Sequence, residues 1–181
     1  MKITDNQTLT EMKEQIKTKA QSCDWLNNPI HTGIVDPDTG KEYILSGYYE
    51  DETGKRHFTH QEALEIADRT PGWDLCTDEF HRLLVDTVWD GEECEWKENV
   101  LGSGLNGFEY LTKKLGYELG GYRSHASGAL YYVGFSGYSW SSTVAASGYN
   151  ARGLHFGPQG LSPTYASCRA NGLQVRCLME N

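Results

Sequence analysis

The stretch GWDLCTDEFHRLLVDTV, residues 72–88, contains a helix whose start can be read from the residue types. Thr77 is a good N-cap because its hydroxyl oxygen accepts a hydrogen bond from a free backbone N–H of the first turn. Asp78 and Glu79 follow in that turn, where the positive end of the helix dipole favours carboxylates. The expected buried stripe of this helix consists of Phe80, Leu83, Leu84 and Val88.

Shorter elements are expected upstream. Thr59 is the expected N-cap of a helix over residues 60–68. The face that this helix buries is expected to carry Ala63, Leu64 and Ala67. Before it, residues 42–49 and 55–58 predict two short strands, which the turn Asp51-Glu-Thr-Gly54 joins.

The two ends of the chain differ in character. After Gly102 the chain is rich in Gly and aromatic residues with short alternating runs, which predicts small antiparallel strands. Two helices before such a sheet predict an α+β fold. Residues 1–28 predict a separate amphipathic helix, with a capping-box pattern at Thr8 and Glu11. This helix either packs on residues 29–181, the expected main domain, or meets copies of itself in a homo-oligomer.

Composition excludes several functions. The 181 residues carry a formal net charge of −9 without any cluster of Lys and Arg, which argues against nucleic-acid binding. No long apolar run is present, so we expect no membrane insertion, and the charged N-terminus predicts no signal peptide. The five cysteines lack CxxC spacing and are expected to be reduced packing residues.

Four motifs follow one another across about residues 42–178. They are GWDLCTDEF at 72–80, GYR at 121–123, GYSWSST at 137–143 and RANGLQVRC at 169–177. In this order they resemble the landmarks of formylglycine-generating-enzyme-like and Fibrobacter succinogenes major paralogous domains. Cys76 stands where that family usually has Pro. The resemblance implies a C-type-lectin-like fold.

The same landmarks frame the variable regions of proteins that diversity-generating retroelements diversify by randomising template adenines. A randomised Asn codon encodes fifteen residue types and never Trp, Gln, Lys, Met or Glu. These five types make up 38 of the 181 residues, so about six are expected in residues 144–171, where only Gln159 is found. The bias fits a variable region at about 127–171, and a loop rich in Gly and Ser would share part of it.

The strand pattern predicts which side chains vary. Leu154, Phe156 and Leu161 keep an apolar rhythm, while the residues between them share no chemistry. One face of the strands is therefore expected to be core and the other a free surface rich in Tyr and Ser, as in antibody paratopes. The expected ligand-contacting residues are Tyr131, Tyr132, Tyr138, Tyr149, Gly153, His155, Gly157, Ser162, Thr164, Tyr165, Ser167 and Ala170. For each Tyr, a place in the core is the alternative.

Other residues are assigned to the scaffold. Trp140 is expected in the core, and Arg169 and Arg176 are expected to hold loops through hydrogen bonds. The six His are scattered and no paired catalytic carboxylates stand out, so we expect no catalytic residue and no cofactor. Acidic residues near two turns are the alternative for a metal site, although a turn is the simpler reading: Asp36, Asp38, Glu50, Asp51 and Glu52.

The sequence thus predicts a ligand-binding module without metal or enzymatic activity, whose hypervariable face selects a protein or glycan receptor. A phage tail protein or a surface-display protein is the expected carrier. Since no signal peptide is predicted, the virion or the cytoplasm is the expected location. The alternative is a non-variable domain of the same fold with a structural or carbohydrate-related role.

Overall fold

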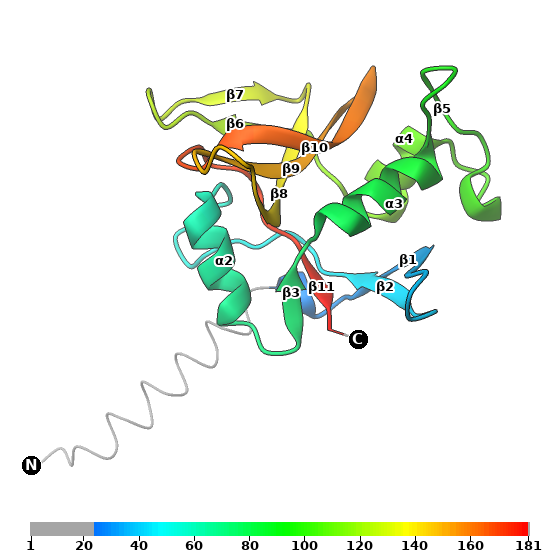
Figure 1. Cartoon of the computed structure of the whole chain (residues 1–181), viewed down its shortest axis with the longest axis horizontal. Coiled ribbons are helices and arrows are strands. Elements are labelled where there is room, and N and C mark those ends of the chain that lie inside the picture. Colours follow the sequence, from blue (N-terminus) through cyan, green and yellow to red (C-terminus); the bar gives the residue numbers. More distant parts are fainter. Residues whose placement is uncertain (1–23, 181) are drawn as a thin grey trace, which may run out of the picture.

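The computed structural model describes residues 24–180 (Figure 1). The amphipathic helix predicted for residues 1–28 therefore lies almost wholly outside the described residues. The described part starts with a short 3-10 helix, η1, Asp24–Leu26, whose Trp25 is buried.

The last strand of the chain lies inside the first sheet. The order of this antiparallel sheet is β1-β2-β11-β3, with the bounds Ile30–Val35, Glu42–Leu45, Cys177–Met179 and Trp73–Leu75. Leu178 in β11 pairs with Leu45 on one side and Asp74 on the other. The segment that leads into β11 is core, because Leu173 and Val175 are fully buried.

A second group of strands forms the upper layer in Figure 1. A three-stranded sheet has the order β10-β9-β8, with the bounds Gly160–Cys168, Asn150–Gly157 and Gly137–Val144. Beside it lies a hairpin of β6, Gly120–Arg123, and β7, Leu130–Val133. A smaller hairpin of β4, Trp89–Asp90, and β5, Glu95–Trp96, follows α3.

Both predicted helices are present. α2, His60–Asp68, has a full capping box, in which Thr59 accepts from the Glu62 N–H and Glu62 accepts from the Thr59 N–H. α3, Asp78–Val88, begins after the N-cap Thr77 as predicted. None of the helices described between residues 24 and 180 is both long and apolar enough to cross a membrane.

The helix faces differ in part from the prediction. α2 buries His60, Ala63 and Ile66, so the predicted Leu64 and Ala67 are only half-buried. α3 buries His81 in addition to Phe80, Leu84 and Val88, and Leu83 stays half-buried. In both helices, a histidine at the edge of the apolar stripe takes a buried position.

The predicted fold class, an α+β C-type-lectin-like domain with two helices, is wrong. Small antiparallel sheets dominate the described part of the chain, and its three α-helices are short. The third helix, α4, Gly107–Glu109, is a single turn that continues into a π-helical turn, η3, Tyr110–Lys114. A 3-10 turn, η2, Val100–Gly102, precedes it. Strands of two to four residues carry too little periodicity to be read from sequence.

The predicted hairpin at 42–58 is also wrong. The turn at Asp51 forms, since the Gly54 N–H donates to the Asp51 carbonyl at 3.0 Å. However, the flanking residues pair with the end of the chain instead of with each other. The Tyr49 N–H donates to the Val175 carbonyl and the Phe58 N–H to the Leu173 carbonyl. β2 instead forms its hairpin with β1 across the turn at Asp36.

Two core clusters cover the two faces of β9. Leu154 and Phe156 belong to the cluster that includes α3, whereas Ala151 belongs to the cluster that includes α2 and Trp140. The predicted arrangement, with one core face and one free face, is therefore wrong for this strand. β9 is the central strand of its sheet, so its backbone is paired along both edges, and of its side chains Asn150, Arg152 and His155 are only half-buried.

Candidate ligand-binding face

Six aromatic rings from five neighbouring strands meet beside the β6–β7 hairpin. Tyr138 in β8 is at their centre, with ring centroids 4.7 Å from His155 in β9, 5.4 Å from Tyr122 in β6 and 5.5 Å from Tyr165 in β10. Tyr122 also packs on two tyrosines of β7. We call this set the aromatic cluster: Tyr122, Tyr131, Tyr132, Tyr138, His155 and Tyr165.

Exposure increases from the base of the aromatic cluster to its rim. Tyr138 is 6% exposed, whereas Tyr131 and Tyr132 are 44% and 57% exposed. Tyr122, His155 and Tyr165 are half-buried between them. The sheet thus supports the base of the cluster and leaves the two β7 rings open to solvent.

The inner rings are uncharged near pH 7, and burial stabilises their neutral forms further. Burial raises the pKa of Tyr138 to about 12 and also raises the pKa of Tyr165. Burial lowers the pKa of His155 below its ordinary value, so the neutral imidazole predominates near pH 7. These groups therefore offer apolar ring faces and neutral hydrogen-bonding atoms.

Tyr132 has an unusual backbone conformation. Its φ of 60° lies in the left-handed region, which is a genuine outlier for a bulky residue. Successive side chains of a regular strand point to opposite faces, yet Tyr131 and Tyr132 both contact Tyr122. The Tyr132 carbonyl holds this geometry by accepting from the Phe135 and Ser136 N–H groups, both at 3.0 Å. Strain of this kind is concentrated at functional sites.

Apolar side chains around β7 extend the exposed surface. Leu130 and Val133 in β7 are exposed, and Phe135 just after it is 74% exposed. β7 is an edge strand of a two-stranded sheet. Exposed apolar side chains gathered in one short segment are typical of an interaction site.

Four predicted contact residues are buried. Tyr138 supports the other rings from below, and Ser167 is enclosed, where its hydroxyl accepts from the Asn171 side-chain amide at 3.2 Å. A Cβ at Gly153 would overlap the Ser139 carbonyl oxygen, and one at Gly157 would lie 2.9 Å from the Phe135 carbonyl oxygen. The structure thus places these four residues beneath the exposed surface, and both glycines are required by close strand packing.

The remaining predicted residues occupy two places. Ser162 pairs with His155 in register, and Thr164 lies half-buried in the irregular stretch before Tyr165. Tyr149, 82% exposed, and the exposed Ala170 lie at the opposite end of the β9–β10 pair, where Tyr149 is about 20 Å from His155 along the strand direction. The structure thus brings five predicted residues together in the aromatic cluster and leaves Tyr149 and Ala170 apart from it.

Tyr122 is the residue of the cluster that the sequence did not predict. It belongs to the GYR motif at residues 121–123, which served only as a family landmark. The sequence feature that could have indicated Tyr122 is the glycine before it. Gly121 has a φ of 62°, and its missing side chain lets the β7 backbone come close. Such a glycine allows β6 and β7 to approach, so that Tyr122 lies against both β7 rings.

Two of the three residues assigned to the scaffold lie where the sequence predicted, and the third, Arg169, has its guanidinium 3.5 Å from the Gly148 carbonyl. Trp140 is fully buried, and its indole N–H donates to the Phe58 carbonyl at 2.7 Å. Arg176 is buried and donates twice to the Ser46 carbonyl, at 3.0 and 2.7 Å. The predictions for these two residues are confirmed.

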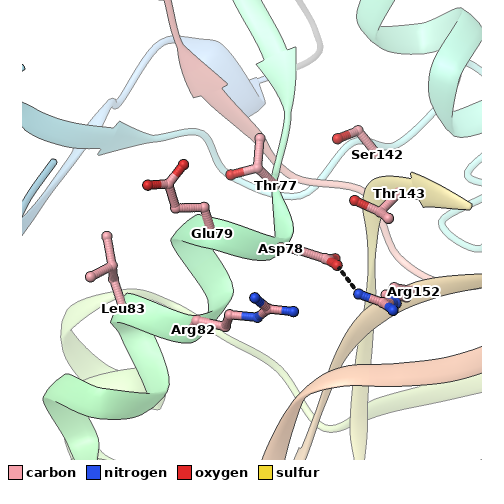
Figure 2. Close-up of a pocket in the computed structure, with 8 residues that line it drawn as sticks. All are labelled: Thr77, Asp78, Glu79, Arg82, Leu83, Ser142, Thr143 and Arg152. Atoms are coloured by element: carbon pink, nitrogen blue, oxygen red, sulfur yellow. Dashed lines mark hydrogen bonds and ion pairs between the residues drawn. The ribbon is translucent and has the colours of Figure 1, made fainter. Parts of the chain in front are cut away.

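A pocket of about 700 Å³ lies on the other side of the sheet, between α3 and β8–β9 (Figure 2). Asp78 and Arg152 form an ion pair at 3.0 Å across it, and Figure 2 shows Arg82 directed towards the same space. The ion pair ties the start of α3 to β9. The lining residues are Thr77, Asp78, Glu79, Arg82, Leu83, Ser142, Thr143 and Arg152.

The carboxylates in the two acidic turns accept hydrogen bonds from the backbone of their own turns. Asp36 accepts from the Asp38 N–H at 2.9 Å and from the Thr39 hydroxyl at 3.1 Å. Asp51 accepts from the Thr53 and Lys55 N–H groups. Carboxylate oxygens of Asp36, Asp38 and Glu79 lie within 4.8 Å of one another, and the turn contacts account for the position of Asp36.

No family model matches the chain, and no curated protein or solved structure shows significant similarity to it.

Proposed function

We propose that this chain is a ligand-binding module and that the aromatic cluster, together with the exposed side chains of β7, is its recognition surface. The observation that carries the proposal is the convergence of rings from five strands onto one surface, with the strained Tyr132 at its rim. Tyr side chains supply large contact areas with few torsions to immobilise.

Pre-organisation supports the same conclusion. The buried Tyr138 fixes the rings of Tyr122, His155 and Tyr165 through direct ring contacts. A ligand that binds rings already held in place loses less conformational freedom on binding. Anchors of this type supply most of the binding free energy at protein interfaces.

We further propose that a retroelement diversifies this surface. Residues 144–171 contain almost none of the five types that a randomised Asn codon cannot encode. The exposed members of the 127–171 region lie on β7 and on the β8–β9 and β10 ends, where substitutions leave the core intact. The carrier of such a surface is a phage tail protein or a surface-display protein. A reverse-transcriptase gene beside an imperfect repeat of the 3′ end of this gene is the expected genomic arrangement, and a gene neighbourhood without them would contradict the diversification.

A display experiment tests the binding function. One library varies Tyr131, Tyr132, Phe135 and Tyr165 with codons for the fifteen residue types. A matched control library varies four exposed residues of α2 and its C-cap: Gln61, Glu65, Asp68 and Arg69. Selection on a defined protein target should enrich binders from the first library only. Equal yields from both libraries would show that the aromatic cluster is no privileged recognition surface.

A further inference from the structure

Charge is divided unevenly along this chain. All 25 Asp and Glu residues lie outside residues 119–177, which contain four Arg and no Lys. This segment therefore carries +4, whereas the whole chain carries −9. It comprises β6 to β10, so the acid-free segment is the one that builds the candidate ligand-binding face (Figure 1).

Two of the four arginines of this segment have no carboxylate partner among residues 24–180: Arg123 lies next to the aromatic cluster, and Arg169 lies at the other end of β9 with Tyr149. Arg123 follows Tyr122 at the end of β6 and donates to the Gly128 carbonyl at 2.7 Å. Arg169 follows β10, beside the exposed Tyr149, whose carbonyl accepts from the Arg169 N–H. Its guanidinium is 3.5 Å from the Gly148 carbonyl.

The other arginines nearby are already neutralised or enclosed. Arg152 pairs with Asp78 at 3.0 Å, and Arg56 pairs with Glu118 at 2.9 Å. Arg176 is buried between the rings of Tyr48 and Tyr117. The positive charges that a partner covering this side of the molecule would meet are therefore Arg123, next to the aromatic cluster, and Arg169, at the other end of β9.

Resting on the function proposed above, we propose that the preferred partner is an acidic protein surface, whose carboxylates pair with Arg123 and Arg169 while its apolar groups pack on the aromatic cluster. Guanidinium groups recognise carboxylates through two parallel hydrogen bonds. A second copy of this chain would bring two acid-free faces together and oppose their arginines, which disfavours self-pairing. A nucleic acid would require a longer basic track than two arginines on a chain of net charge −9.

Selection on two matched targets tests the inference. The library at Tyr131, Tyr132, Phe135 and Tyr165 is displayed on the full chain and selected on one fluorescent protein in two surface versions, net negative and net positive. Clones that bind no better than the parent are discarded. This step removes binding that comes only from attraction between the target and the acidic residues outside 119–177, which do not vary in the library. We expect about ten-fold more binders to the negative version at physiological salt.

Variant backgrounds locate the effect. The same library with Arg123→Gln and Arg169→Gln should lose the preference for the negative target. The double variant Arg69→Gln and Arg82→Gln, which changes two exposed arginines outside the acid-free segment, should retain it. The two backgrounds change the same side-chain type, so general loss of positive charge does not explain a difference between them.

Each contrary outcome has its own meaning. Equal numbers of binders to both targets, or a preference that survives removal of both arginines, would overturn the inference and leave the proposed function standing. An absence of binders to either target, in a library that expresses folded protein, would overturn both. Self-association of the parent that Tyr131→Ala abolishes would assign the face to a second copy and overturn the inference.

Discussion

The α2–α3 region, residues 60–88, and the β6–β10 region, residues 119–177, differ in what determines them. In the first, N-caps and apolar stripes define two helices whose limits agree with the sequence. In the second, strand positions depend on partners far along the chain, such as Phe58 with Leu173. The first region shows how local interactions specify structure. The second shows that long-range packing decides which side chains become a surface.

The largest expected effect is a loss of stability when a core residue of the β6–β10 region is truncated. Trp140→Ala should lower the free energy of unfolding by about 3–5 kcal/mol, because a fully buried ring and its hydrogen bond to Phe58 are lost. Denaturant unfolding of parent and variant measures the difference. Tyr149→Ala is the matched aromatic control, since its ring is exposed. Similar midpoints for the two variants would contradict the place of Trp140 in the core.

A smaller effect of about 2 kcal/mol concerns His81 in the first region. His81 is buried, its ring nitrogens have no hydrogen-bond partner among the described residues, and burial lowers its pKa to about 4. Its unfolded pKa is about 6.5, so the unfolded chain binds more protons between those values, and stability falls as the pH falls through that window. The parent should lose about 2 kcal/mol more than His81→Leu between pH 7 and pH 5.

Chemical unfolding at both pH values measures this difference. His57, His60 and His155 also have lowered pKa values and are present in both proteins, so the comparison isolates His81. The nearby Asp78 carboxylate raises the pKa of His81, against the effect of burial, and Asp78 itself is present in both proteins. Parallel losses of stability in the two proteins would show that His81 is not a buried neutral group.

The sequence predicted the fold where the information is local. The helix starts at Thr59 and Thr77 were correct, and Trp140 and Phe156 are core. The fold class was not predicted correctly, since the strands around β11 form only when the end of the chain inserts between β2 and β3. No short window of sequence contains that pairing.

The candidate face was predicted in part for the same reason. Tyr131, Tyr132 and Tyr165 were expected at a surface because of their residue type, and they do meet. Burial of Gly153 and Ser167 followed from the central position of β9 and the packing of Asn171, which depend on the tertiary fold. Residue type therefore indicated the chemistry of the face, whereas the tertiary fold determined which residues lie on it.

An effect of about 1 kcal/mol tests the strain at the rim of the face. Tyr132→Gly should be about 1 kcal/mol more stable than Tyr132→Ala, since both lose the ring and only Gly adopts a φ of 60° without a steric penalty. At Tyr131, whose φ is not positive, the order should reverse, because Gly is less favourable than Ala in a strand. Thermal or denaturant melts of the four variants give both differences. The same order at both positions would show that Tyr132 is unstrained.

The smallest expected effect separates exposed positions from buried ones within the predicted variable region. Substitution of Tyr149 or Ala170 by Asp, Ser or His should change the free energy of unfolding by no more than about 0.5 kcal/mol, because both side chains face solvent. The same substitutions at Ser167 should cost more than 1 kcal/mol for Asp and His, since the enclosed site accepts a hydrogen bond from Asn171 and has no room for a larger or charged group. Differential scanning fluorimetry of the two series checks the contrast. If all three positions tolerate the substitutions equally, burial does not limit variation in this region, and the division between scaffold and recognition surface drawn from the structure fails.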